Sequence, residues 1–197
     1  MREKRMRKIS PWQICLVAMA VVINIAGGQI ALLLRLPVYL DSIGTVLIGA
    51  LLGPWFGLLP SLLSGLVMGM AGDIYSLYFA PVGMITGMVS GLLLYGRKVK
   101  GFGLLLAGLG ITVPGTIVSS LINAALFGGV TSSGSTILVQ LLARTPLGLT
   151  GSIFVVQFLT DYADRCIAVF AVSLLLPRIL GELRQRLSGN ECNRERH

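Results

Sequence analysis

The sequence predicts an all-α fold, an integral membrane bundle of six transmembrane helices that forms one domain over residues 1–197. Hydrophobic residues make up 54% of the chain and charged residues 12%, and the mean hydropathy is +0.84. Apolar runs of about 20 residues recur along most of the length, and a run of that length crosses a hydrocarbon core of about 30 Å. The lipid bilayer is therefore the expected solvent of the fold.

The first helix is expected over residues 11–34, after a basic N-terminal segment over residues 1–10. A charged start followed by an apolar run also describes a secretory signal peptide. This run is too long for the apolar region of a cleaved signal, and it is long enough to cross a bilayer at about 20 residues per span. We therefore expect it to be retained as the first transmembrane helix.

The apolar stretch over residues 42–72 needs a break. As a single helix its roughly 31 residues would measure about 46 Å at about 1.5 Å per residue, well beyond the hydrocarbon core. Gly53 and Pro54 supply the break, because proline removes a backbone donor and clashes with the preceding turn. Two short helices result, and the remaining spans are expected over residues 79–95, 102–127 and 151–176.

The basic residues support a count of six spans. Of the 16 Lys and Arg residues, 13 lie in three groups, at residues 2–8, 97–100 and 178–196. Six spans place all three groups on one side of the membrane, and an excess of Lys and Arg is typical of the cytoplasmic side. We therefore expect both termini to be cytoplasmic (N-in, C-in), with the bundle over residues 11–177 and a basic cytoplasmic tail over residues 178–197.

The same parity places three connections outside, at residues 35–41, 72–77 and 128–150. The last of these includes a stretch over residues 136–150 that is too short to span and is broken at Pro146. We expect an outer loop or lid between the fifth and sixth helices, which could close over a bound molecule.

Small residues recur at intervals of four along several predicted spans, as in Gly83, Gly87 and Gly91. Such spacing lets helix backbones approach closely in a membrane, and we expect most of these residues to pack inside the bundle. A smooth face of small residues also forms on the first span; its members are Ala20, Asn24, Gly27, Gly28 and Ala31. This face could dock on a neighbouring helix of the same chain or on a separate membrane subunit.

Several function classes are not expected. The net charge of +8 does not indicate nucleic acid, which needs a basic patch on a folded soluble surface. Cys15, Cys166 and Cys192 have no paired spacing and form no Cys/His cluster, so no disulfide, metal site or cofactor is expected. His197 is the single histidine, and the sequence holds no metalloprotease motif or paired nucleophile and base, so it is not expected to be an enzyme. It also lacks a Walker A loop, so pumping would need energy from a partner.

The sixth span carries a polar face inside an apolar run. Gln157, Asp161, Asp164 and Arg165 lie within about 100° of one another on a helical wheel, so this face must point into the bundle. Asp161 and Arg165 are four residues apart and could form an internal ion pair. Alternatively, Gln157 and Asp161 form a wall of a substrate cavity, and Arg165 sets the charge state of the carboxyl group.

Further candidates for substrate contacts come from the outer ends of the spans and the outer connections. They are Asn24 and Gln29 on the first span, Arg35, Tyr39 and Asp41 in the first connection, and Asp73, Tyr75 and Tyr78 around the second. Tyrosine suits a ring-bearing ligand with polar edges, but it also suits an interfacial belt. The aspartates could instead cap helices, and the amides could bond neighbouring helices.

Three long stretches give the chain a family resemblance: "GGQIALLLRLPVYLDSIGTVLIGALLGPWFGLLPSLLSGL", "GDIYSLYFAPVGMITGMVSGLL" and "TDYADRCIAVFAVSLLLP". With the basic N-terminus, they resemble the substrate-binding S component of an energy-coupling factor (ECF) transporter, over nearly the whole chain. The resemblance implies a multi-pass protein of a prokaryotic plasma membrane that captures a vitamin or related micronutrient between its outer loops and outer helix ends. It also implies a coupling membrane subunit and two ATPase subunits as partners.

The resemblance is closest to members associated with cobalamin or queuosine precursors, and riboflavin, pantothenate or thiamine-related ligands would leave similar traces. Many members dock on the coupling subunit through an Ala-x-x-x-Ala element in the first helix. Here Ala18 is followed four residues later by Val22, and the smooth face of the first span is a looser substitute. Three other functions stay open: a self-sufficient channel or facilitator, a membrane-embedded enzyme, and a structural assembly subunit.

Overall fold

The computed structural model describes residues 10–97, 99, 101–131, 134–146 and 148–194. Within these residues the chain forms helices and turns and no strand, so the prediction of an all-α fold is confirmed. Most of the predicted basic N-terminal segment, and Lys98 and Lys100 of the basic loop, lie outside the described residues.

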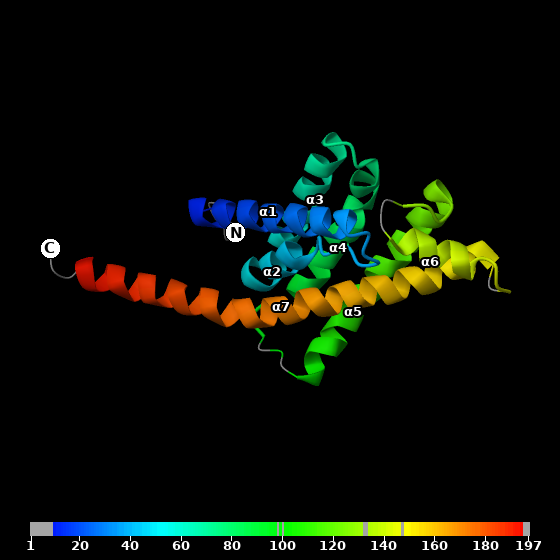
Figure 1. The fold of residues 1–197 in the computed structure, drawn as a ribbon. Helices are drawn as coiled ribbons and strands as arrows, with labels where there is room; N and C mark the ends of the chain where they lie inside the picture. The colour runs from blue at the N-terminus through cyan, green and yellow to red at the C-terminus, as the bar shows by residue number, and fades with distance from the viewer. Residues whose placement is uncertain (1–9, 98, 100, 132–133, 147, 195–197) are drawn as a thin grey trace, which may run out of the picture.

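Figure 1 shows the order of the helices. They are α1 (Pro11–Leu33), α2 (Ile43–Leu52), α3 (Pro54–Met70), α4 (Ile74–Leu94), α5 (Phe102–Ile122), the π-helical turn η1 (Asn123–Phe127), α6 (Ser135–Leu142) and α7 (Gly148–Arg194). Among the described residues, three segments are long and apolar enough to cross a membrane: α1, α4 and the continuous helix formed by α5 and η1. The count of six crossings and the N-in, C-in orientation stay predictions.

The predicted break in the stretch 42–72 is confirmed at Gly53 and Pro54. Gly53 has a φ of +96° and ends α2, and Pro54 begins α3, where its fixed φ and missing N–H are tolerated. The helix α2 has 10 residues and measures about 15 Å, about half of a hydrocarbon core. The segment before it, residues 34–42, is not helical. The second predicted span is therefore a helix of 10 residues, and the irregular segment before it includes the predicted connection 35–41.

Glycines let α2, α3 and α4 approach within backbone contact, as the spacing of small residues predicts. A Cβ atom on Gly87 of α4 would lie 1.9 Å from the carbonyl oxygen of Gly57 on α3, and a Cβ on Gly57 would lie 2.4 Å from that of Gly87. Neither position has room for a larger residue, because the obstacle on each side is rigid backbone.

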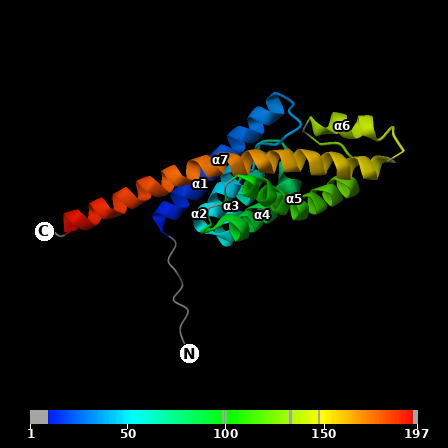
Figure 2. The ribbon, with the colours of Figure 1, turned by 90° about the horizontal axis from the view of Figure 1, so that it is seen from below.

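The last helix differs from its predicted length. The sixth span was predicted over residues 151–176, but α7 has 47 residues and continues through Pro177 to Arg194, so most of the predicted tail belongs to this helix. Figures 1 and 2 show α7 running along the whole molecule, with its C-terminal part projecting beyond the other helices. Buried Val169 and Val172 of α7 pack against Val46 of α2 and Ile111 of α5.

The connection between α5 and α7 contains the short helix α6, in agreement with the prediction of a helix too short to span. Val139 of α6 packs on Ile153 and Val156 of α7. A Cβ atom on Gly134, at the start of α6, would lie 2.1 Å from the carbonyl oxygen of Arg35. The connection is therefore packed against both α7 and the irregular segment 34–42.

We expect Gly87→Ala to destabilise the protein and Gly115→Ala to raise its stability by up to about 1 kcal/mol. The new methyl group at position 87 meets backbone at 1.9 Å, whereas at Gly115 the nearest atom, Thr86 Oγ1, is 3.6 Å away. Overpacking costs about 1–3 kcal/mol, and the gain in helix propensity is about 1 kcal/mol at both positions. Midpoints of thermal unfolding of the detergent-solubilised variants would show the difference, and equal midpoints would contradict the close approach of α3 and α4.

Candidate functional site

The N-terminus of α2 lies inside the molecule and is capped by a side chain from α1. Asn24 is 1% exposed; its Oδ1 accepts a hydrogen bond from the Gly44 N–H at 2.8 Å, and its Nδ2 donates to Thr45 Oγ1 at 2.7 Å. A Cβ on Gly44 would lie 2.2 Å from the carbonyl oxygen of Ala20. Because the first N–H groups of a helix have no partner within it, Asn24 compensates for starting α2 in the interior.

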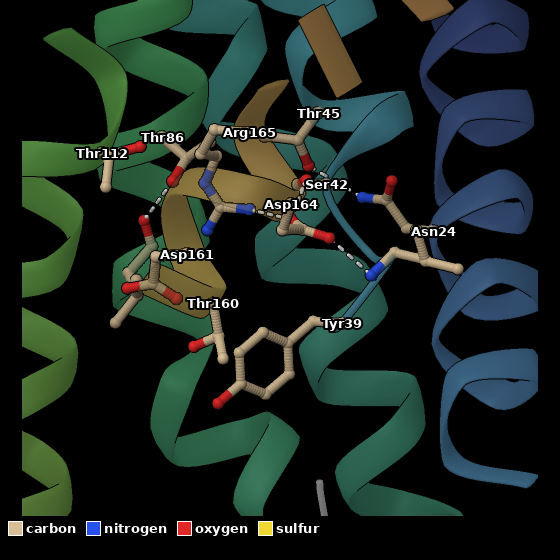
Figure 3. A network of polar contacts seen from close by, with 12 residues as sticks. Asn24, Tyr39, Ser42, Thr45, Thr86, Thr112, Thr160, Asp161, Asp164 and Arg165 are labelled. Carbon is tan, nitrogen blue, oxygen red and sulfur yellow. Dashed lines mark hydrogen bonds and ion pairs between the residues drawn. The ribbon is translucent and has the colours of Figure 1, made fainter. Parts of the chain in front are cut away.

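Asp164 joins α7 to the same region. Its Oδ1 accepts a hydrogen bond from the Leu40 N–H at 2.7 Å, and its Oδ2 accepts one from Ser42 Oγ at 2.6 Å. Oδ2 also forms an ion pair with Nη1 of Arg165. In Figure 3, Asp164 lies between the Arg165 guanidinium and Ser42. The ion pair in the described part of the chain is thus Asp164–Arg165, so the alternative of an Asp161–Arg165 pair is wrong.

Asp161 has different partners, which explains why it does not pair with Arg165. Its Oδ2 accepts hydrogen bonds from Thr116 Oγ1 at 2.9 Å and Ser119 Oγ at 3.0 Å, both on α5. Asp161 is 3% exposed. In Figure 3 the Arg165 side chain lies between Asp161 and Asp164. The two carboxylates of α7 therefore have different roles. Asp164 bonds the segment before α2, whereas Asp161 is bonded by α5 and lines a cavity.

This cavity lies where the outer ends of the predicted spans meet. It offers about 90 Å³ in which the centre of a water molecule fits, and one water needs about 10–15 Å³ by that measure, so there is room for several waters or a small ligand. Its lining includes Tyr39 and Asp41, Asp73 and Tyr75, and Thr131. The three connections predicted to lie outside thus converge on one hollow.

Eight of the eleven predicted substrate residues line the cavity: Asn24, Tyr39, Asp41, Asp73, Tyr75, Gln157, Asp161 and Arg165. Three do not. Gln29 is exposed on α1 and donates to Met68 Sδ at 3.2 Å, Arg35 is exposed in a left-handed turn with a φ of 49°, and Tyr78 packs edge-on against Phe127. These three side chains are exposed at the surface of the protein and do not line the hollow.

Other lining residues were missed by the sequence analysis. Besides small and aliphatic residues, they include hydroxyl and aromatic side chains inside helices: Thr45, Ser61, Ser64, Ser119 and Phe79. A serine within an apolar helix also suits helix packing, so its type alone does not identify a cavity. The three-residue spacing of Ser61 and Ser64 places both on one side of α3, and this was the available signal.

Tyr39 connects the cavity to α6 and α7. Its hydroxyl accepts a hydrogen bond from Gln157 Nε2 at 3.2 Å and lies 3.4 Å from Ser135 Oγ. Burial raises the pKa of Tyr39 to about 12, so the phenol stays protonated at neutral pH. The Asp41 side chain lines the cavity and is partly accessible to solvent. Desolvation by the surrounding protein and the nearby charge of Asp164 raise its pKa to about 6.

Two buried polar atoms of cavity-lining residues have no hydrogen-bond partner among the described residues. They are Oε1 of Gln157, an acceptor, and Nε of Arg165, a donor. Gln157 is 1% exposed and Arg165 5%, and an unsatisfied buried polar atom costs about 1–3 kcal/mol. A molecule in the cavity that presents both a donor and an acceptor would satisfy them.

The smooth face of α1 is occupied by the chain itself. Ala20, Asn24 and Ala31 are buried, a Cβ on Gly27 would lie 2.1 Å from the Leu40 carbonyl oxygen, and one on Gly28 would lie 3.6 Å from Asp41 Cβ. Of the two predicted uses of this face, docking within the chain is the one that the contacts support. Gly27 and Gly28 remain partly exposed beside these contacts.

Comparison with models of protein families, with curated proteins and with solved structures finds no match for this chain. The function is therefore inferred from the geometry of the cavity and from the sequence motifs.

We expect Asp164→Ala to destabilise the fold more than Asp161→Ala does. Removing Asp164 leaves Arg165 without its ion pair and removes the acceptor of the Leu40 N–H and Ser42 hydroxyl, and breaking a buried pair in this way costs about 3–5 kcal/mol. Asp161→Ala removes two hydrogen bonds from hydroxyl groups, and Ser119 retains the Thr116 carbonyl at 3.2 Å, so a loss of about 1–2 kcal/mol is expected. Thermal unfolding in detergent would rank the variants; the reverse order would contradict these roles.

Proposed function

We propose that this chain is the substrate-binding S component of an ECF-type importer, which captures a small vitamin-like compound outside the cell. The observation that carries the proposal is a cavity in an apolar helical bundle where several polar side chains converge, two of which have a buried polar atom with no partner among the described residues. Concave sites with a few convergent polar groups are typical of small-molecule binding. The family resemblance of the three quoted stretches supports the same class.

The energy for transport would come from partners. The sequence has no Walker A loop, so it cannot bind and hydrolyse ATP by that route. A coupling membrane subunit and two ATPase subunits would drive release toward the cytoplasm, as the resemblance implies. Both termini and the basic loop at residues 97–100 would face those partners if the cavity opens outward.

The dimensions of the cavity favour a small ring compound over a corrinoid. The volume that is open to the centres of water molecules is about 90 Å³, which corresponds to several waters. A corrin macrocycle with its side chains is much larger. Tyr75 and Phe79 contribute aromatic rings to the lining, and aromatic faces suit a planar heterocycle. Of the two ligand classes that the sequence favours, the queuosine precursor fits this hollow better than cobalamin.

The contacts of α6 support a lid that closes over the ligand. Gly134 approaches the backbone of Arg35 and Ser135 lies next to Tyr39, so the connection between α5 and α7 covers the segment that lines the cavity. A movement of this connection would widen the entrance of the cavity and close it over a bound ligand, a gating motion that is common at binding sites.

Transport should require the coupling module. In proteoliposomes, we expect ATP-dependent accumulation of a labelled compound when the chain is reconstituted with a coupling subunit and ATPases, and none with the chain alone, which would bind without transporting. Thiamine, riboflavin, pantothenate, cobalamin and 7-aminomethyl-7-deazaguanine are the probes. Equal uptake in both preparations would indicate a facilitator, and failure to bind any of them would favour an assembly subunit.

Tyr39→Phe should weaken binding of the compound that copurifies with the protein, once mass spectrometry has identified it. The variant loses the hydroxyl that bonds Gln157 at the cavity, and a hydrogen bond of about 0.5–1.5 kcal/mol corresponds to a loss of affinity of roughly twofold to twelvefold. Tyr78→Phe is the matched control, because Tyr78 is 48% exposed and packs on Phe127. Calorimetric titration would measure both variants; equal losses would contradict the assignment of Tyr39.

A further inference from the structure

The cavity has an uneven balance of charge. Among the described residues that line it, Asp41, Asp73 and Asp161 are acidic and Arg165 is the sole basic residue. The Arg165 charge is compensated by Asp164 in a buried ion pair. Formally, the pair contributes zero and the three aspartates contribute −3, so the hollow has an excess of negative charge.

The three carboxylates that line the cavity differ in how they are held. Asp161 accepts two hydrogen bonds from hydroxyl groups of α5, both at Oδ2, and neither donor carries a charge. Asp73 accepts a hydrogen bond from Ser76 Oγ at 2.6 Å at the start of α4. The Arg165 charge acts on Asp161 and Asp41 as well as on Asp164. One guanidinium offsets at most one of these four carboxylates, and hydrogen bonds from neutral groups leave the remaining negative charge in place.

From this arrangement we infer that the ligand is a cation, a heterocycle with a protonated amine or a quaternary ring nitrogen, and that Asp161, Asp41 and Asp73 select its charge. The inference rests on the proposed function and specifies the class of its substrate. Burying a carboxylate without an opposite charge is costly, and a cationic ligand supplies that charge when it enters.

The unpartnered atoms define the rest of the ligand. Gln157 Oε1 needs a donor, and Arg165 Nε needs an acceptor. A ring edge that carries an N–H beside a carbonyl oxygen or a ring nitrogen provides both groups. Because Arg165 is already paired with Asp164, its free N–H suits a neutral acceptor. The aromatic rings of Tyr75 and Phe79 in the lining also favour a cation, which is attracted to the face of a ring.

Anionic compounds should be rejected. A carboxylate or phosphate ester in this cavity would add a like charge beside three aspartates, and the one guanidinium present is already neutralised. Pantothenate and phosphorylated vitamins are therefore excluded as ligands by the same arrangement that favours thiamine-like or aminomethyl-bearing heterocycles.

The test uses compounds that share a ring and differ in charge, with the full-length protein in nanodiscs. The first pair is 7-aminomethyl-7-deazaguanine, a cation at neutral pH, and 7-cyano-7-deazaguanine, which is neutral. The second pair is thiamine and thiamine monophosphate, whose phosphate offsets the ring charge. We expect at least one cationic member to bind at least tenfold more tightly than its partner, by calorimetric titration and by the rise in unfolding midpoint.

Asp161→Asn keeps the size of the side chain and removes its charge. This variant should reduce the preference for the cation to less than threefold while the affinity for the less positive compound stays within threefold. If Asp161→Asn does not fold, Asp73→Asn at the start of α4 should lower the preference in the same direction. Retention of the full preference in a folded variant would overturn the role of the carboxylate.

Two other results would overturn the inference. One is binding of the less positive member of each pair as tightly as the cation, and the other is the absence of a shift in unfolding midpoint with either cation at millimolar concentration. The proposed function has a separate outcome: a neutral compound that is bound and imported by the complete complex leaves the S-component role intact. If a cation is bound and its uptake needs no coupling module, the S-component role is wrong, but the preference of the cavity for cations stands.

Discussion

The structure depends on how three charges are accommodated within an apolar bundle. A charged side chain that faces hydrocarbon costs about 2.5–3.5 kcal/mol even on insertion scales, and Asp161, Asp164 and Arg165 are each at most 5% exposed. Asp164 neutralises Arg165 and Asp161 is held by hydroxyl groups of α5. The hydroxyl groups lie on α5, and Asp164 also bonds Leu40 and Ser42, which directly precede α2. The face of α7 that carries the charges therefore points inward, and the cavity forms beside it.

The same charges stabilise the irregular backbone before α2. Buried N–H and C=O groups outside a helix need other hydrogen-bond partners. Asp164 bonds the Leu40 N–H, and Asn24 bonds the Gly44 N–H. The polar side chains therefore gather where α2 begins, since this is where the backbone lacks helical partners. The hollow that could take a ligand is next to this irregular backbone.

The sequence predicted features within single helices, but it did not predict which residues far apart in the chain form hydrogen bonds. Composition predicted helices, Gly53 and Pro54 predicted the break, and the spacing of Gln157, Asp161 and Arg165 predicted a polar face that lines the cavity. The partners of Asp164 were not predicted, because Leu40 is 124 residues away and a helical wheel compares positions within one helix. The length of α7 was underestimated because polarity after Pro177 marks the end of an apolar run and not the end of a helix.

The contacts of the segment 34–42 link the cavity to its cover. Asp164 holds Leu40 and Ser42, Gly27 packs against the Leu40 carbonyl, and Gly134 approaches the Arg35 carbonyl. A ligand that bonds Gln157 also acts on Tyr39, whose hydroxyl lies beside Ser135 of α6. Because α1 and α7 contact this segment as well as α6, a movement of α6 or of α7 would change the shape of the cavity. A displacement of α7 from its projecting C-terminal end would therefore act on Asp161 and Asp164 and on the contacts of α6 together.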